Sequence, residues 1–239
     1  MGMGWWAAAG DLLLGARCQA CLRPWWGLCP ACRASLRSRT PRGTRPTPCP
    51  VGFPPTSTAG WYDEPMRRLI VGHKERQALG LAPMLGELLA TACWHLIRTR
   101  VAPAEAEFTL VPIPSARAAV RSRGYDATAV LARRAAALLR PAAPVRVRRL
   151  LRHHRGVHDQ SGLDAAARQR NLADSLRVRD AAAGATRQGM IIIVDDLVTT
   201  GATLTEASRA LTAAGMAVLG AATIAATRRH HAALADRTR

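Results

Sequence analysis

Residues 191–204 read IIIVDDLVTTGATL. A run of four β-branched apolar residues is typical of a strand that is buried on both faces of a parallel sheet. This strand leads into two acids, Asp195 and Asp196, and a Thr/Gly turn then opens an apolar-periodic helix. In open α/β sheets, ligands bind outside the carboxyl ends of the strands. The segment therefore predicts an α/β fold with a ligand site just after this strand.

The turn that follows the acids has the composition of a phosphate site. Thr199, Thr200 and Thr203 supply hydroxyls, and a helix that begins here offers free backbone N–H groups and the positive end of its dipole. Gly201 lets the backbone close around an anion. The pair Thr203 and Glu206 matches a capping box, which predicts that the helix begins at this threonine. Because a phosphate would repel the two acids, we expect them to face a sugar diol, whose hydroxyls can donate.

The rest of the chain predicts alternating strands and helices. Strands are expected at residues 110–113, 145–151, 190–194 and 217–224, and helices at 81–97, 126–140 and 203–214. Residues 115–125 are expected to form a basic loop, and the Pro-, Arg- and Thr-rich residues 37–55 look like a linker. Strands that alternate with helices indicate a parallel sheet flanked by helices.

Two other protein classes also place acids after an apolar strand. A P-loop NTPase is excluded because the chain has no Gly-x4-Gly-Lys-Ser/Thr motif, and its only lysine, Lys74, follows His73 in a different context. A Mg²⁺-binding receiver domain would carry its acidic pair on the first strand, whereas this pair lies near the C-terminus. Both interpretations are weaker than a phosphate and sugar site.

The N-terminal part contains two closely spaced cysteine pairs, Cys18-x2-Cys21 and Cys29-x2-Cys32. Two such pairs supply the four thiolates of a tetrahedral zinc site, and a site with all four positions filled is structural. Two disulfides are the alternative, which a cytoplasmic location disfavours. We expect Cys49 to be a linker thiol and Cys93 to lie in the core.

The chain is strongly basic, with a formal net charge of +18. Such a charge attracts nucleic acid, anionic membranes or phosphorylated metabolites, although part of it can simply maintain solubility. Arginine so far outnumbers lysine that the single Lys74 is expected to need its compact ammonium group. The single Asn171 is singled out by the same argument, with chance survival as the alternative in both cases.

The sequence shows no run of the about 20 apolar residues that a membrane-spanning helix requires. Residues 1–14 are apolar, but they lack a basic segment and contain Asp11. We expect a short packed helix rather than a signal peptide, no membrane insertion and a cytoplasmic location.

Residues 191–204 resemble the phosphoribosyl pyrophosphate (PRPP) motif of type I phosphoribosyltransferases. The resemblance implies that Asp195 and Asp196 hold the ribose hydroxyls. It also implies that the following loop, Thr199, Thr200, Gly201, Ala202 and Thr203, cradles the 5′-phosphate.

A four-cysteine segment ahead of this motif resembles the ComF family. Further similar blocks are Trp61-Tyr62 to Lys74, Val111-Pro-Ile-Pro114 to Arg121-x-Arg123-Gly-Tyr125-Asp126, and Gln160-x2-Leu163 to Arg168-x2-Asn171. The departures are mild: Tyr125-Asp126 stands where many members have an aromatic residue and Asn, and Leu176 replaces a usual Phe. The implied fold is a type I phosphoribosyltransferase fold preceded by a small zinc-ribbon-like module. The implied division is a zinc module at 1–45, a linker at 46–60 and a transferase domain at 61–239.

The resemblance also implies a set of roles. Arg121 and Arg123 would neutralise the pyrophosphate together with Mg²⁺, although any single arginine can equally be a solvated surface charge. Lys74, Arg155, Gln160, Arg168 and Asn171 would belong to a mobile lid or to the acceptor side. The implied activity is phosphoribosyl transfer. The alternative is a PRPP-responsive adaptor for single-stranded DNA or a DNA-uptake helicase, since members of this family are associated with competence.

Overall fold

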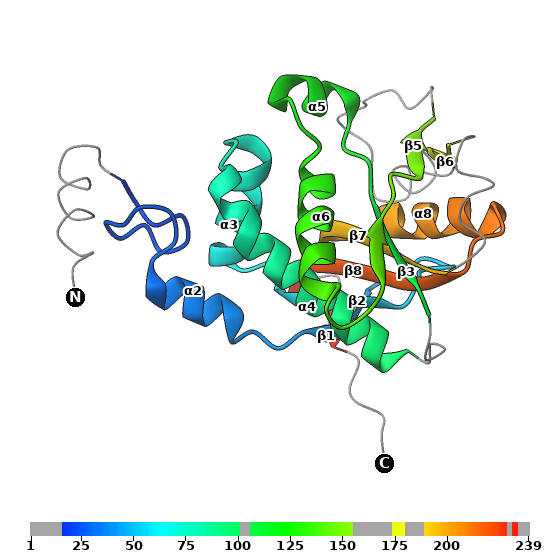
Figure 1. Ribbon diagram of the computed structural model, residues 1–239, viewed down its shortest axis with the longest axis horizontal. Coiled ribbons are helices and arrows are strands. Elements are labelled where there is room, and N and C mark those ends of the chain that lie inside the picture. Colours follow the sequence, from blue (N-terminus) through cyan, green and yellow to red (C-terminus); the bar gives the residue numbers. More distant parts are fainter. Residues whose placement is uncertain (1–15, 101–105, 155–173, 180–188, 229–230, 234–239) are drawn as a thin grey trace, which may run out of the picture.

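The computed structural model describes residues 16–100, 106–154, 174–179 and 189–228, together with the backbone of residues 231–233 (Figure 1). A seven-stranded sheet has the order β4-β3-β7-β8-β2-β1-β9. Its strands are β1 (Arg42–Pro46), β2 (Thr56–Trp61), β3 (Phe108–Pro112), β4 (Val145–Val147), β7 (Met190–Val198), β8 (Val218–Ala226) and β9 (His231–Ala233). The strands from β4 to β2 in this order pair in parallel, and β1 and β9 are added antiparallel at one edge. The predicted α/β class is confirmed.

Helices cover both faces of the sheet (Figure 1). The helices are α2 (Pro30–Arg37), α3 (Glu64–Glu75), α4 (Ala82–Thr99), α5 (Arg117–Arg123), α6 (Ala127–Leu139) and α8 (Ala202–Ala213), with the 3-10 turn η1 (Leu79–Leu81) before α4. Helices α4 and α6 pack on one face, and α8 packs on the other together with the small antiparallel pair β5 (Leu151–His153) and β6 (Leu176–Val178).

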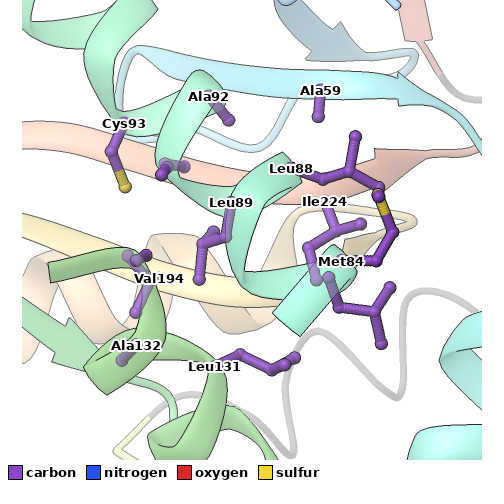
Figure 2. Packing of buried hydrophobic residues seen from close by; sticks show 14 of the residues in the cluster. Ala59, Met84, Leu88, Leu89, Ala92, Cys93, Leu131, Ala132, Val194 and Ile224 are labelled. Carbon is purple, nitrogen blue, oxygen red and sulfur yellow. The ribbon is translucent and has the colours of Figure 1, made fainter. Parts of the chain in front are cut away.

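Strand β7 runs through the centre of the core. Ile192 and Val194 pack into the cluster under α4 and α6, whereas Ile191 and Ile193 pack into the cluster under α8. Figure 2 shows Val194 among the side chains of α4 and α6. This alternation explains why residues 191–194 of the strand are all apolar, because each of its faces is covered by helices.

The four-cysteine module packs against the main domain. Cys18, Leu28 and Leu36 belong to the same buried cluster as α4. At the surface of this contact, Arg37 forms two hydrogen bonds of 2.7 and 2.9 Å with Glu87 of α4. The module and the sheet therefore share one continuous core.

Within the described residues, one helical segment, Leu79–Thr99, is long and apolar enough by length and composition to cross a membrane. Most of it is buried inside the domain, as the core helix of a soluble protein is.

Several sequence-based expectations differ from the structure. The residues expected to form a basic loop contain helix α5, which ends at Gly124 in the left-handed region. The strand expected over 145–151 is split into β4 and β5, which lie in different sheets. The expected linker is integrated at both ends, because Pro46 closes β1 and Thr56 begins β2. Backbone pairing at the sheet edge therefore orders part of a segment whose composition is typical of a loop.

The helix after the acidic strand begins at Ala202, and its N-cap is Gly201 without a side-chain cap. The predicted capping box is therefore wrong. Glu206 is buried and instead accepts a hydrogen bond from Leu176 N of β6 at 3.1 Å and pairs with Arg209 at 2.7 Å. The tertiary partner outcompetes the local one because it satisfies both a buried amide and a buried carboxylate.

Candidate functional site

The acidic pair lies near the carboxyl end of β7, at the edge where the parallel strands end. Asp195 and Asp196 continue the strand, which extends to Val198 and not only to residue 194 as expected. Asp196 is buried and Asp195 is half-buried. The carboxylate of Asp195 accepts a hydrogen bond of 2.9 Å from the Asp196 amide, so the two acids are held in a fixed relation to each other.

Lys74 is the ionic partner of Asp196. It lies in the last turn of α3, a helix that starts directly after β2 with Asp63 as its N-cap. Its Nζ lies 2.9 Å from Oδ1 and 2.7 Å from Oδ2 of Asp196. The Lys74 side chain is 37% exposed, whereas that of Asp196 is 4% exposed. A buried carboxylate is therefore paired with an ammonium group that still reaches solvent.

The pKa values of these groups follow from burial and charge. Burial alone would lower the pKa of Lys74, but the carboxylates of Asp196 and Asp195 outweigh it and raise the pKa. Burial raises the pKa of Asp195 to about 8, and the neighbouring charge of Asp196 acts in the same direction. One ammonium group thus faces two carboxyl groups that compete for it.

The expected phosphate loop follows at the N-terminus of α8. Thr199 and Thr200 are exposed, and Gly201 has a φ of +80°, which places it in the left-handed region. A Cβ atom on this glycine would lie 2.6 Å from Phe53 Cε2 and 3.0 Å from Pro46 Cγ. The loop is therefore packed against Phe53 and Pro46 at Gly201, while Thr199 and Thr200 are exposed and Thr203 is half-buried.

The proline-bearing strand β3 lies beside β7, and the loop that follows it reaches toward Lys74. Arg121 is exposed, whereas Arg123 is half-buried and donates a hydrogen bond of 2.8 Å to the carbonyl oxygen of Lys74. The hydroxyl of Tyr125 donates to the carbonyl oxygen of His73 at 2.7 Å. These two contacts attach the loop between β3 and α6 to the C-terminal end of α3.

Asp126 joins this arrangement from the start of α6. It caps α6, accepting from Ala129 N at 3.3 Å, and it also accepts from Ser115 Oγ at 3.0 Å and Arg149 at 3.2 Å. No local sequence pattern marks Ser115 or Arg149. Only their distance from Asp126 in space makes them part of the site.

Arg155, Gln160, Arg168 and Asn171, expected at the lid or acceptor side, lie outside the residues that the structure describes. Their assigned roles remain predictions.

The four cysteines form a compact cluster at the N-terminal side of the molecule. All four Sγ atoms lie within 4.8 Å of one another, and those of Cys21 and Cys29 are 3.9 Å apart. Zinc–sulfur bonds of about 2.3 Å in a tetrahedron place sulfurs about 3.8 Å apart. Cys29 also caps α2 and donates its amide to Cys18 Sγ at 3.4 Å. The cluster fits a zinc ion.

The protonation of the cluster agrees with this fit. Burial opposes ionisation of the Cys18 thiol, but hydrogen bonds from the backbone of Cys21, Cys29 and Ala20 lower its pKa to about 6. Burial and then the neighbouring sulfurs raise the pKa of Cys32. Ionisation of one thiol therefore opposes ionisation of its neighbour, and a bound cation would relieve this repulsion.

Comparison with known protein families identifies the C-terminal half. Residues 128–238 match the phosphoribosyl transferase domain. The phosphoribosyltransferase match begins in α6 and contains β7, the acidic pair and the loop before α8. Lys74 and the cysteine cluster precede it. No protein of established function in the curated collections matches the chain.

Proposed function

We propose that this protein binds PRPP together with Mg²⁺ and transfers its phosphoribosyl group. The observation that carries the proposal is the position of Asp195 and Asp196 at the carboxyl edge of the sheet, directly before an open Thr/Gly loop at a helix N-terminus. The match of this segment to a phosphoribosyltransferase domain supports it. Hydroxyls of a ribose can donate to the two carboxylates, and the loop can donate to the 5′-phosphate.

The remaining charges of PRPP lie on its pyrophosphate. Mg²⁺, held mainly by oxygens of the substrate, would supply charge neutralisation as the pyrophosphate leaves. Arg121 is an exposed cation of the β3–α6 loop and has the freedom to grip a phosphate bidentately. Arg123 has a different role in this proposal, because its contact with the Lys74 carbonyl makes it a positioning residue.

The finer assignment is to a ComF-like transferase with a structural zinc ion in a cytoplasmic protein. The support is the order of the two modules, with the four-cysteine cluster ahead of the matched domain. A link to competence and DNA uptake is part of this proposal and follows from the resemblance alone.

The direct test is calorimetric titration of Mg²⁺-PRPP into the wild-type protein and into Asp195→Asn and Asp196→Asn. At a pH above about 8, where Asp195 is ionised, we expect each variant to weaken binding by about 10-fold or more, since a charge-assisted hydrogen bond contributes roughly 1.5–3 kcal/mol. Glu107→Gln, which changes an exposed acid at the far end of β3, is the matched control and should bind as wild type. Unchanged affinity in both aspartate variants would refute the assignment.

A second candidate function is a PRPP-responsive adaptor that binds single-stranded DNA. The observation in its favour is Trp26, which is 70% exposed and lines a surface cavity of the zinc module together with Arg17 and Arg33. Exposed aromatic rings beside arginines suit stacked bases and phosphates. The test is fluorescence anisotropy of a labelled oligonucleotide at several salt concentrations with wild type and Trp26→Ala. A salt response that is flat, or identical affinity in the variant, would remove this candidate.

A further inference from the structure

Lys74 contacts two parts of the site, one of which, Asp196, lies 122 residues away from it in the sequence. Its ammonium group contacts Asp196, whereas its carbonyl oxygen is held by Arg123 of the β3–α6 loop. The residue therefore stands between the acidic pair, which in the proposed function binds ribose, and the loop that in the same proposal binds pyrophosphate.

The ion pair occupies the atoms that a ribose would need. Nζ of Lys74 lies within 2.9 Å of both carboxylate oxygens of Asp196. A diol that donates hydrogen bonds to this carboxylate must displace the ammonium group at least in part, because each oxygen has few directions left for donors in a buried site. The displaced charge then needs a new anionic partner, since a cation that loses its partner near the protein interior is costly.

We propose that Lys74 exchanges partners when substrate binds. In the free protein its ammonium group neutralises Asp196. In the complex, ribose hydroxyls replace it on the carboxylate, and the ammonium group binds an oxygen of the pyrophosphate. No covalent bond forms or breaks, and the protonated lysine keeps its proton throughout. The inference rests on the proposed function and assigns Lys74 to the pyrophosphate, instead of to the lid or the acceptor side.

The local structure permits this exchange. The end of α3 is fixed from outside, because Arg123 binds the carbonyl oxygen of Lys74 and Tyr125 binds that of His73. The side chain is 37% exposed and can rotate about its four-carbon stem while the backbone stays in place. Arg123 also acts on Lys74 as a nearby positive charge.

The chain offers an unusually specific probe, because Lys74 is its only lysine. Full-length, zinc-loaded protein labelled with [ε-¹³C]lysine should give one lysine side-chain signal. Asp196→Asn should move this signal in the free protein, since it removes the ion pair. Addition of Mg²⁺-PRPP, or of Mg²⁺-pyrophosphate alone, should move the wild-type signal to a new position. Calorimetric binding of PRPP without any shift of this signal would overturn the exchange while leaving the proposed function intact.

The second arm separates the ligands. Lys74→Met should weaken the binding of Mg²⁺-pyrophosphate and of Mg²⁺-PRPP by at least 10-fold. It should not weaken the binding of ribose 5-phosphate, because that ligand competes with the lysine for Asp196. Arg76→Met, which removes an exposed cation two residues further along the same helix end, is the control and should bind all three ligands as wild type. Equal weakening of all three ligands by Lys74→Met would indicate a purely structural lysine and refute the exchange. Failure of the wild-type protein to bind PRPP would refute the proposed function and the exchange with it.

Discussion

At the scale of the residue, neighbouring carboxyl groups differ because their surroundings differ. Asp196 is buried and has a cation in contact with both oxygens, whereas Asp195 shares that cation only through space and accepts a backbone amide. Contact with Lys74 therefore offsets the cost of burying Asp196, whereas the cost of burying Asp195 is offset only in part.

The pH dependence of stability should carry the signature of Asp195. Its pKa in the folded protein is about 8, above the ordinary value of 3.8. Between these values the folded state binds more protons than the unfolded state, so the stability that this group contributes is greatest at low pH and is lost as the pH rises through about 8.

The test compares wild type with Asp195→Asn by thermal unfolding at a series of pH values between the two pKa values and above. We expect the variant to gain stability relative to wild type as the pH rises, by on the order of 1 kcal/mol, because one pKa unit corresponds to about 1.4 kcal/mol and the side chain is only half-buried. Curves that run parallel at all pH values would show that the pKa of Asp195 is not raised.

Gly201 and Gly215 lie at the two ends of α8 with almost the same backbone conformation, φ +80° and +76°. A Cβ atom on Gly201 would overlap Phe53, whereas on Gly215 it would meet nothing within 4 Å. We expect Gly215→Ala to cost about 1 kcal/mol from backbone strain. Gly201→Ala should destabilise the fold clearly more, and it should also weaken the binding of PRPP, since the loop must move. Denaturant unfolding and calorimetry check both, and equal destabilisation would contradict the role given to Phe53.

At the scale of the element, helix α4 shows how close packing outweighs helix propensity. Gly86 faces α6, where an added Cβ atom would lie 2.5 Å from Arg134 Cβ. The lack of a side chain lets the two helices approach each other while both cover the sheet. Glu206 of α8 follows the same rule, because its contact with β6 replaces the local cap that its sequence position favours.

Replacing Gly86 by alanine should therefore have the opposite effect on stability to the one that helix propensity predicts. Gly→Ala in a helix normally stabilises by up to about 1 kcal/mol, but Gly86→Ala should lower the midpoint of thermal unfolding, because overpacking costs roughly 1–3 kcal/mol. Gly80→Ala, at a position where nothing lies within 4 Å, should be neutral or stabilising. A Gly86→Ala variant as stable as the Gly80→Ala variant would show that the helices can separate without cost.

At the scale of the whole molecule, the cysteine cluster is an integral part of the domain. Cys18 is fully buried, and Leu28 and Leu36 pack into the core under α4. Arg68 of α3 also donates to the carbonyl oxygen of Ala20 in the module at 3.0 Å. Since α3 carries Lys74, the module supports the helix that reaches the acidic pair.

Removal of zinc should consequently destabilise the entire domain and not only its N-terminal part. The purified protein should contain about one zinc ion per chain. Treatment with a chelator should lower the midpoint temperature of a single unfolding transition, measured by calorimetry with circular dichroism. It should also weaken the binding of PRPP. Cys93→Ala is the control, because Cys93 lies in the core away from the cluster; its metal content should be normal. Two separate transitions, with the larger one unchanged by the chelator, would contradict the shared core.

Local patterns along the chain are enough to predict the acidic strand, the Thr/Gly loop, the paired cysteines and the parallel sheet. These features are local patterns: a buried parallel strand must be apolar at each position, and two Cys-x2-Cys pairs present four ligands wherever they occur. Composition also singles out Lys74, although it does not reveal the partner of this lysine.

Contacts between side chains of separate elements follow from the fold and not from local patterns. The pairing of Lys74 with Asp196, the packing of Phe53 on Gly201 and the contact of Glu206 with β6 all join residues from separate elements. The sequence favoured a loop where α5 forms and a linker where β2 begins, because propensity weighs neighbours along the chain and takes no account of the surface on which a segment packs. Partner choice for a buried charge depends on distance in space, and the fold sets that distance.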